Sequence, residues 1–407
     1  MFVWLVLLSS QAGSLPGGTK GSCCDGRGEK SGGTRPGFYT RITLRGNYIH
    51  ASTGLRFTPT GSLTLSGLPS GSGAYVAKAY LIYSVIAPSS MPDIQLNGIP
   101  VAGQLVGTAP SPCWSDPNFY TYIADVTDIV RAQGDGVYTL SGYYNPSGNP
   151  PPGGTEGATL VAIYCEPNYQ GTPPRDVVIY LGAYTLDEGE ECDEWGNVVD
   201  QDTLQWTTAN FSATNPVSSA KLTVLFADGQ DYWDGTCGEE VVQFNGYTLR
   251  SGSTGLPGGN GYLWDAVHIE DATSLIPGGS SSASNYFEVK WDESGCSGCV
   301  DCVTAVGEIL MVSSTNPENF DCSALDVDEG WVESPPLAVR GTELILKLPF
   351  PMWGELEAYS PAGQRVKTIA WGKLSSGKWD LRELGPGVYY IILRTEGFRA
   401  SVKAVVR

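Results

Sequence analysis

Three aspartates near the middle of the chain are spaced to bind a cation. Asp228, Asp231 and Asp234 occur at every third position of a glycine-containing stretch. Calcium takes six to eight oxygen ligands, and carboxylates on a flexible turn supply several of them. The first interpretation is a solvated acidic loop without a cofactor, because the equivalent stretch of the repeat described below, Ser84–Ser90, contains no carboxylate. The alternative is a calcium site on these three side chains, and calcium is the one cofactor that the sequence suggests.

The ten cysteines offer a second kind of chemistry. Cys296, Cys299 and Cys302 have the close spacing of zinc or iron–sulfur ligands. However, four cysteines occur up to residue 165 and six between residues 192 and 322, and such even groups suit disulfides formed within each domain in an oxidising compartment. We predict disulfides, with a metal site as the alternative. The candidates are Cys23, Cys24, Cys113, Cys165, Cys192, Cys237, Cys296, Cys299, Cys302 and Cys322.

Groups suited to catalysis are scarce. The chain has two histidines, His50 and His268, and we assign both a structural role. The sequence contains no nucleophile elbow, phosphate-binding loop or His-Glu-x-x-His motif. A glycoside hydrolase with paired carboxylates among residues 228–234 or 187–202 is the remaining catalytic alternative, since that mechanism needs two carboxyl groups at a set separation. We predict a protein without enzymatic activity.

The elements that would position these residues are written twice in the chain. Three landmarks recur in the same order at offsets of 143, 148 and 146 residues. They are the apolar strand Ala77–Tyr83 with its counterpart Ala220–Phe226, the turn Asn97-Gly98 with its counterpart Asn245-Gly246, and the pair Asp125/Thr127 with its counterpart Asp271/Thr273. Asn-Gly between apolar runs predicts a tight hairpin, and Asp-x-Thr predicts a side-chain cap on the backbone. We infer two copies of one β-domain.

Composition and strand pattern together predict an all-β protein. The chain has 52 glycines and 27 prolines, and no long stretch has helical periodicity. We predict two tandem jelly-roll-like β-sandwich domains followed by a small immunoglobulin-like sandwich. The predicted boundaries are residues 1–37 for a signal-like apolar run and flexible arm, 38–184 for the first sandwich, 185–320 for the second, 321–336 for a linker and 337–407 for the last domain.

The negative charge of the chain is concentrated in the second copy. The net charge is −19, and residues 187–330 contain 26 acidic and 3 basic side chains. A phosphate backbone would be repelled by such a surface, so nucleic acid is excluded as a partner and cations are favoured.

The first residues, Met1–Ala12, form an apolar run followed by small side chains. They resemble the core and cleavage site of a secretory signal, although the basic start of such a signal is missing. The alternative is an apolar strand that is donated to a neighbouring subunit. About eight apolar residues are too few to cross a bilayer, so we do not expect the chain to span a membrane.

The C-terminal segment resembles a known family. Tyr359–Val366, Leu384–Tyr390 and Lys403–Arg407 are similar, in order and placement, to motifs of the C-terminal sorting domains (Por) of type IX secretion cargo. This resemblance implies that the last domain is the address by which the secretion machinery carries the protein across a bacterial outer membrane. It also implies that the protein is then released or attached to the cell surface.

A second resemblance covers the first β-domain. Asp125–Thr127, Gly136–Leu140 and Arg175–Gly182 are similar to a family of uncharacterised β-rich domains of bacterial and archaeal surface proteins. This resemblance implies a location and a fold but no chemistry.

These observations predict a non-enzymatic, secreted or surface-attached structural protein. We expect it to assemble with itself into an extracellular filament or coat, through exchange of strands or of the N-terminal arm. The alternative is a surface adhesin or carbohydrate-binding protein that uses aromatic side chains beside cation-dependent acidic loops, such as Trp195, Trp233 and Trp264.

Overall fold

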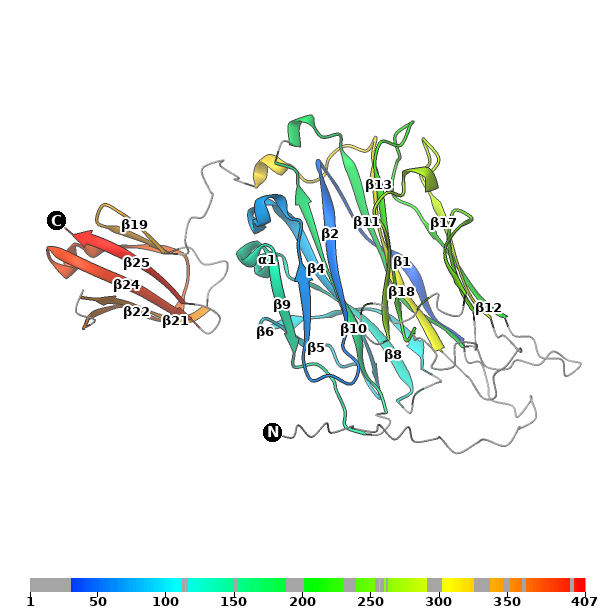
Figure 1. Ribbon diagram of the computed structural model, residues 1–407, viewed down its shortest axis with the longest axis horizontal. Coiled ribbons are helices and arrows are strands. Elements are labelled where there is room, and N and C mark those ends of the chain that lie inside the picture. Colours follow the sequence, from blue (N-terminus) through cyan, green and yellow to red (C-terminus); the bar gives the residue numbers. More distant parts are fainter. Residues whose placement is uncertain are drawn as a thin grey trace, which may run out of the picture.

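The computed structural model describes most of the chain outside the N-terminal segment and several loops. The described residues are 31–111, 114, 116–148, 152–167, 169–187, 201–229, 239–252, 256, 260, 263–290, 302–325, 337–346, 352–360, 364–395 and 399–406. They form antiparallel sheets that are packed face to face, with one short α-helix (Figure 1). The predicted all-β sandwich fold is confirmed.

The first sandwich pairs a five-stranded sheet, in the order β2-β10-β4-β8-β7, with a four-stranded sheet, in the order β3-β9-β5-β6. The strands are β2 Gly46–Gly54, β3 Gly61–Leu65, β4 Val76–Ala87, β5 Asp93–Leu96, β6 Ile99–Ala102, β7 Gln104–Pro110, β8 Asn118–Asp125, β9 Gly136–Ser141 and β10 Gly154–Cys165. Helix α1 (Thr127–Gln133) follows β8, and the 3-10 turns are η1 Pro69–Gly71, η2 Gly73–Tyr75 and η3 Tyr169–Gly171.

The second sandwich repeats this plan. Its sheets have the orders β1-β11-β18-β13-β16 and β12-β17-β14-β15. The strands are β1 Gly32–Leu44, β11 Arg175–Asp187, β12 Gln201–Thr208, β13 Ala220–Ala227, β14 Glu239–Phe244, β15 Tyr247–Gly252, β16 Trp264–Ile269, β17 Ala283–Lys290 and β18 Cys302–Ser313, with the 3-10 turns η4 Thr273–Leu275 and η5 Cys322–Ala324. The order β2-β10-β4-β8 of the first copy is matched by β11-β18-β13-β16, and β3-β9-β5-β6 is matched by β12-β17-β14-β15.

The predicted landmarks of the repeat take the same form in both copies. Asn97 has a φ of 54° and Asn245 a φ of 49°, and the glycine after each is also in the left-handed region, as a two-residue hairpin of type I′ requires. Each asparagine also accepts a hydrogen bond on its side-chain oxygen, at 2.8 Å from the Thr139 N–H and at 2.9 Å from the Ser284 N–H. The two predicted hairpins are therefore confirmed.

The two Asp-x-Thr pairs also form the predicted caps. Asp125 accepts from the backbone N–H and the hydroxyl of Thr127 at 3.0 and 2.5 Å, and Asp271 accepts from Thr273 at 3.1 and 2.7 Å. The cap fixes the turn that follows β8 in the first copy and β16 in the second.

The sheet pairing differs from the predicted domain boundaries at two places. β11, which we assigned to the end of the first domain, pairs with β18 and β1, so the predicted boundary at 184/185 falls inside this strand. β1 begins at Gly32, inside the stretch predicted as a flexible arm, and it is an edge strand of the second sandwich. The prediction was wrong here because an apolar run indicates a strand but does not specify which sheet the strand joins. In the repeat, β11 is the counterpart of β2.

The two sandwiches are joined by a third apolar core. Alternate residues of β4 face opposite sides, so that Leu81 lies in the core of the first sandwich and Ile82 in the core between the two five-stranded sheets. Leu310 and Ile309 of β18 divide in the same way between the second sandwich and this shared core. The result is a stack of four sheets (Figure 1). We call the contact between the two five-stranded sheets the seam.

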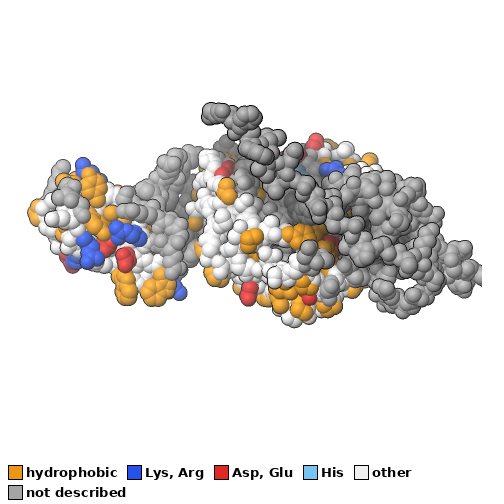
Figure 2. Space-filling model, turned by 60° about the horizontal axis from the view of Figure 1, so that its bottom comes forward, with side chains coloured by type: hydrophobic (Ala, Val, Ile, Leu, Met, Phe, Trp, Pro, Cys, Tyr) orange, Lys and Arg blue, Asp and Glu red, His pale blue; other side chains and the backbone are white. Residues whose placement is uncertain are grey.

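The C-terminal sandwich is built from the sheets β19-β20-β23 and β22-β21-β24-β25. Its strands are β19 Leu337–Arg340, β20 Glu343–Leu346, β21 Met352–Tyr359, β22 Arg365–Leu374, β23 Gly377–Asp380, β24 Gly387–Thr395 and β25 Arg399–Val406, with the 3-10 turn η6 Leu381–Leu384. Leu356, Ile391 and Leu393 lie in an apolar core that is separate from the other three. Basic, acidic and hydrophobic side chains are intermixed on the face of this domain seen in Figure 2. The small sandwich predicted from the sequence is present.

Candidate functional site

The predicted calcium ligands are only partly within the described residues. Asp228 follows β13 and is 3% exposed, and its Oδ2 accepts a hydrogen bond from Trp114 Nε1 at 2.8 Å. Burial raises the pKa of the Asp228 carboxyl. Asp231 and Asp234 lie outside the described residues. Among the residues that the structure does describe, no group of three or more His, Cys, Asp or Glu side chains is arranged to hold a metal ion, and the calcium site stays a prediction.

One disulfide contradicts the pairing that we predicted. Cys165, at the end of β10, is bonded to Cys322, with 5.7 Å between the two Cα atoms. The bond therefore joins the two groups of cysteines instead of staying within one. The cause lies just upstream, where the backbone N–H groups of Asn319 and Phe320 donate to the carbonyl of Thr43, near the end of β1. At this point the chain passes from β1 into β2 of the first sandwich. The start of the predicted linker 321–336 is thus part of the folded body.

The other cysteine candidates are not tested by the structure. Outside the described residues lie Cys23, Cys24, Cys113, Cys192, Cys237, Cys296 and Cys299, and the side chain of Cys302 is not described. The choice between disulfides and a metal at residues 296–302 therefore remains a prediction.

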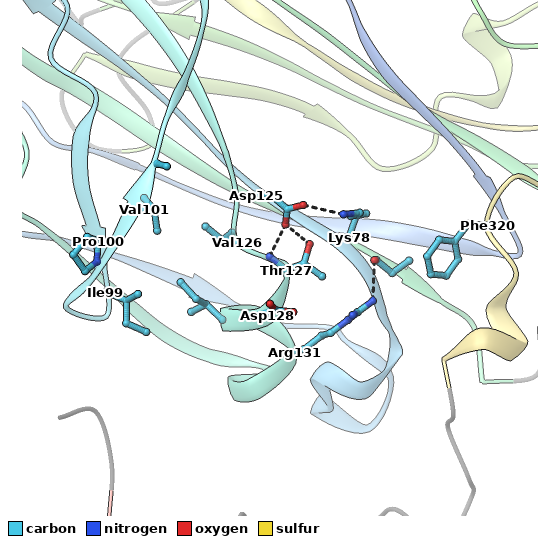
Figure 3. Close-up of a pocket in the computed structure, with 13 residues that line it drawn as sticks. Lys78, Ile99, Pro100, Val101, Asp125, Val126, Thr127, Asp128, Arg131 and Phe320 are labelled. Carbon is cyan, nitrogen blue, oxygen red and sulfur yellow. Dashed lines mark hydrogen bonds and ion pairs between the residues drawn. The ribbon is translucent and has the colours of Figure 1, made fainter. Parts of the chain in front are cut away.

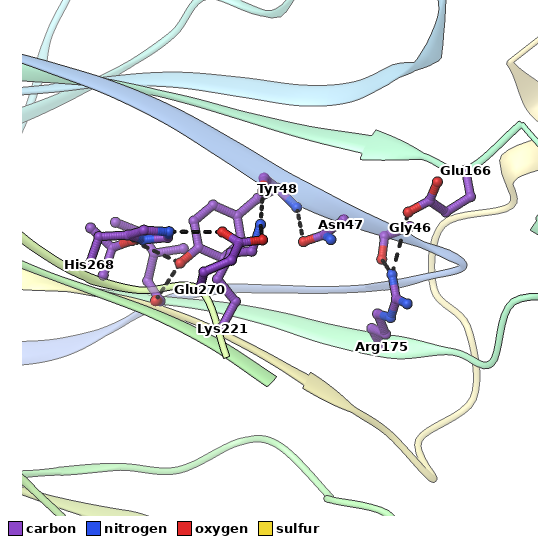
Figure 4. A network of polar contacts seen from close by, with 10 residues as sticks. Gly46, Asn47, Tyr48, Glu166, Arg175, Lys221, His268 and Glu270 are labelled. Carbon is purple, nitrogen blue, oxygen red and sulfur yellow. Dashed lines mark hydrogen bonds and ion pairs between the residues drawn. The ribbon is translucent and has the colours of Figure 1, made fainter. Parts of the chain in front are cut away.

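The two predicted structural histidines meet at the seam, with ring centroids 4.7 Å apart. His268 belongs to a polar network drawn from both copies (Figure 4). Thr223 is at its centre, because its hydroxyl lies 2.8 Å from Tyr48 Oη and 2.8 Å from His268 Nδ1. His268 Nε2 in turn lies 3.0 Å from Glu270, which forms an ion pair with Lys221 at 2.8 Å. The network links β2 of the first copy to β13 and β16 of the second, so it fixes the register of one sandwich on the other.

Electrostatics shift the pKa values of two side chains at this contact, His50 and Glu270. Burial, the neighbouring His268 and the charge of Lys221 lower the pKa of His50 to about 4, so that its ring is neutral. Burial opposes ionisation of Glu270, but hydrogen bonds from Lys221 and His268 outweigh it and lower the pKa of this carboxyl. A neutral ring beside a closed ion pair is suited to holding two surfaces together.

The same residues close the edge of β2. Arg175 Nη1 donates to the Gly46 carbonyl at 2.8 Å, and Lys221 Nζ donates to the Tyr48 carbonyl at 3.3 Å (Figure 4). The Tyr48 N–H donates to the side chain of Asn47 at 2.8 Å. An edge strand whose backbone groups are occupied by charged side chains does not accept another strand. The second copy therefore protects an edge of the first.

The edges of the two outer sheets differ from each other. β6 and β15 are counterparts, and both are edge strands without a buried residue. In a two-residue hairpin the pair next to the turn exchanges both of its hydrogen bonds, so the following residue directs its backbone outward. That residue is Pro100 in β6 and Thr248 in β15, at the same register position. Proline removes the outward N–H from β6, whereas Thr248 keeps it in β15. Directly after Thr248, β15 has a bulge, and Arg250 Nη1 donates to the Leu249 carbonyl at 2.9 Å.

A groove of about 470 Å³ lies between β6 and α1 (Figure 3). Ile99 and Val101 line one side. On the other side Lys78 is paired with Asp125 at 2.8 Å, and Arg131 donates to the Val76 carbonyl at 2.8 Å. Because these charged groups are engaged in holding α1 against β4, the groove has a structural explanation.

Comparisons with known proteins do not assign a function. The chain matches no protein-family model and no curated protein. A peptide-N(4)-(N-acetyl-β-D-glucosaminyl) asparagine amidase is 11% identical over 67% of this chain and 98% of its own, with a TM-score of 0.21. The extracellular domain of ANXUR2 from Arabidopsis thaliana is 10% identical over 67% and 92%, with a TM-score of 0.21. The BSP domain of a biofilm-associated protein is 10% identical over 94% and 84%, with a TM-score of 0.16. Similarity at this level carries no functional argument.

The part of the chain that the structure describes contains no helix long and apolar enough to cross a bilayer.

Proposed function

We propose that this protein is a non-enzymatic extracellular structural protein that assembles into filaments by adding a strand to the open edge of β15. The difference between Thr248 and Pro100 carries the proposal. Pro100 removes an outward N–H from the edge of β6, whereas Thr248 keeps it at the edge of β15, so strand addition at β15 alone has one direction and propagates instead of closing. The donor is the apolar run Phe2–Leu8, which lies outside the described residues.

The seam supports a mechanical role for the two sandwiches. A filament subunit has to transmit force without its domains separating, and here an apolar core, the Thr223 network and the Cys165–Cys322 bond all cross between the copies. Inside the second sandwich, the Asp176 carboxylate accepts from Thr43 at 2.6 Å and from Ser314 at 2.6 Å, and so it joins β1, β11 and the segment after β18. We expect the two copies to behave as one rigid unit.

The C-terminal sandwich supports export of this unit. Its core is separate from the others, and its sequence resembles sorting domains of type IX secretion cargo. In the proposal this domain engages the secretion machinery, and the unit is delivered to the cell surface or released from it.

Electron microscopy of the native secreted material tests the assembly. The proposal expects filaments whose subunit repeat is one copy of the chain. Native protein that stays monomeric at every concentration would favour a soluble binding protein instead.

A further inference from the structure

The four-stranded sheet of the C-terminal sandwich has one face in the domain core and one face outside it. Each strand of the sheet β22-β21-β24-β25 contributes a side chain to the core, and neighbouring residues along a strand point to opposite sides. We call the side that points away from the core the outer face. The core residues that define it are Leu374 of β22, Leu356 of β21, Ile391 of β24 and Ala404 of β25.

Two tryptophans lie together at one end of the outer face. Trp353 of β21 is opposite Lys373 and Trp371 of β22 is opposite Glu355, so both indoles are on this face. Their ring centroids are 6.3 Å apart and their planes are at 70° to each other. Trp353 is 56% exposed and Trp371 is 72% exposed. Because these indoles bury little of their area, the stability of the fold does not account for them.

A row of four residues crosses the outer face further along the strands. Arg365 is opposite Tyr359, Tyr359 is opposite Tyr390, and Tyr390 is opposite Lys403, so two aromatic side chains lie between two basic ones. Tyr390 is 43% exposed. Trp353 and Tyr359 are on the same strand, about 20 Å apart at the usual rise per residue. The outer face therefore offers aromatic contacts at two places, and an extended molecule is needed to reach both.

Two arginines lie between these aromatic groups. Arg365 forms an ion pair with Glu357 at 3.0 Å, and Arg394 forms an ion pair with the same carboxylate. Arg394 Nη2 also donates to the Tyr359 hydroxyl at 3.1 Å. Glu357 is buried, whereas the side chains of Arg365 and Arg394 are 63% and 40% exposed. One buried carboxylate thus orients two guanidinium groups that keep further N–H donors open to solvent.

The charge of the outer face favours an anion. Its described charged side chains are four basic and two acidic ones, namely Arg365, Lys373, Arg394, Lys403, Glu355 and Glu357. The outer face is therefore positive, in a chain whose net charge is −19. Guanidinium groups bind carboxylates through paired hydrogen bonds.

The aromatic side chains narrow the class of anion. Exposed indole and phenol rings bind the apolar face of a sugar ring by stacking. An acidic peptide would use the same guanidinium groups, but it does not offer a ring in every unit. A polymer of uronic acids has a carboxylate and a ring in every unit, and it is long enough to reach both aromatic groups.

We propose that the outer face of the C-terminal sandwich binds an acidic polysaccharide. Trp353 and Trp371 stack on sugar rings at one end, Tyr390 contacts the polymer at the other end, and Arg365 and Arg394 pair with its carboxylates. The domain has an apolar core of its own, so this binding requires neither the edge of β15 nor the seam. It gives the domain a second role beside export, which is to hold the exported chain on an acidic polysaccharide.

Calorimetric titration of the full chain with three polymers of similar length tests this proposal. Oligogalacturonate has carboxylates and rings, a dextran oligosaccharide has rings alone, and oligoglutamate has carboxylates alone. We expect oligogalacturonate to bind with a Kd below about 1 mM and the other two polymers to bind about tenfold more weakly or not at all. Binding should weaken between about 50 and 500 mM salt, because the arginines are exposed and their charges are screened.

Two variants of the outer face test the residues. Trp371→Ala and Arg394→Gln should each weaken the binding of oligogalacturonate about tenfold. Trp371 is largely exposed, so its replacement should shift the melting temperature by no more than about 2 °C. Arg394→Gln leaves Arg365 paired with the buried carboxylate. Lys403→Gln, at an exposed position of the same face, provides the same test if Arg394→Gln does not fold.

Two matched controls change similar side chains elsewhere and should not weaken binding. Tyr247→Ala removes an aromatic ring that is 53% exposed on the second sandwich. Lys378→Gln removes a basic side chain that is 65% exposed on β23, in the other sheet of the C-terminal sandwich. The proposal is overturned if oligogalacturonate does not bind, or if Trp371→Ala binds it as the unchanged chain does. Equally tight binding of oligoglutamate would also overturn it, in favour of an acidic protein as the partner.

Discussion

His50 and His268 lie side by side across the seam, with ring centroids 4.7 Å apart. They are the two histidines of the chain, and they come from different copies of the repeat. His50 is on β2 and His268 on β16, so the contact exists only when the two five-stranded sheets are packed face to face. Contact between the two rings therefore shows that the seam has formed.

Acidification should destabilise the folded chain through His50. Its pKa is about 4 when folded and about 6.5 in a model peptide, so between these values the unfolded chain binds a proton that the folded chain does not. Stability contributed by the neutral ring is complete above the unfolded pKa and is lost as the pH falls toward the folded one. The loss is at most roughly 3 kcal/mol.

Urea unfolding of the unchanged chain and of His50→Gln, at about pH 7 and about pH 4.5, measures this effect. Relative to the unchanged chain, His50→Gln should have a higher unfolding free energy at the lower pH than at about pH 7. Comparing two proteins at each pH cancels the titration of Glu156 and Glu308, whose raised pKa values act in the opposite direction. A difference that does not change with pH contradicts the role assigned to His50.

Removing the Cys165–Cys322 bond should lower the stability of both sandwiches together. The bond closes a loop of 157 residues, and a loop of this length predicts a loss of about 2–5 kcal/mol when both cysteines are changed to serine. The expected result is one unfolding transition at a lower denaturant concentration. Two separated transitions in the unchanged chain would show that the copies unfold independently, against the idea of a single unit.

Replacing Asp176 by asparagine should be costly. The carboxylate accepts hydrogen bonds from Thr43, Ser212, Ser314 and Asn316 at 2.6, 3.1, 2.6 and 2.7 Å. In Asp176→Asn an amide nitrogen replaces one carboxylate oxygen and faces hydrogen-bond donors instead of accepting from them. We therefore expect a loss of about 3 kcal/mol in unfolding free energy. Glu343→Gln, which removes an exposed ion pair with Lys378, is the control and should change stability by less than about 1 kcal/mol. Equal effects of the two changes would contradict the account.

Deleting residues 337–407 should leave the body of the protein intact. The apolar core of the C-terminal sandwich is separate, so the melting temperature of the remainder should shift by no more than about 2 °C. In the producing cell the shortened protein should accumulate inside the outer membrane in folded form. Its appearance in the medium would contradict the sorting role.

Much of the fold could be predicted because the repeat is carried by local signals. Asn-Gly turns, Asp-x-Thr caps and alternating apolar residues each depend on a few neighbouring positions, and the structure forms all three twice. The partner sheet of β11 and β1 depends instead on which apolar face meets which. A strand such as β4, which is buried on both faces, is apolar at most positions without a regular alternation, and so its sequence does not indicate its neighbours.

The sites were harder to predict for the same reason. The approach of His50 to His268, of Arg56 to Asp228 and of Cys165 to Cys322 all depend on the seam, which brings together residues more than 150 positions apart. Asp228 was singled out as a calcium ligand because of its neighbours in the sequence, whereas the contact that the structure shows is with Trp114. Arg56 is a single arginine after a strand, and the residues next to it in the sequence do not predict the side chains that surround it, which include Trp114 and Glu156.

The most direct test of the proposed assembly exchanges Pro100 and Thr248. Thr248→Pro gives β15 the closed edge that β6 already has, at the same position of the hairpin, so the fold should tolerate it. Negative-stain microscopy should show filaments for the unchanged chain and monomers with the same melting temperature for Thr248→Pro, whereas Pro100→Thr should leave the filaments in place. Filaments of Thr248→Pro identical to those of the unchanged chain would contradict assembly through the edge of β15.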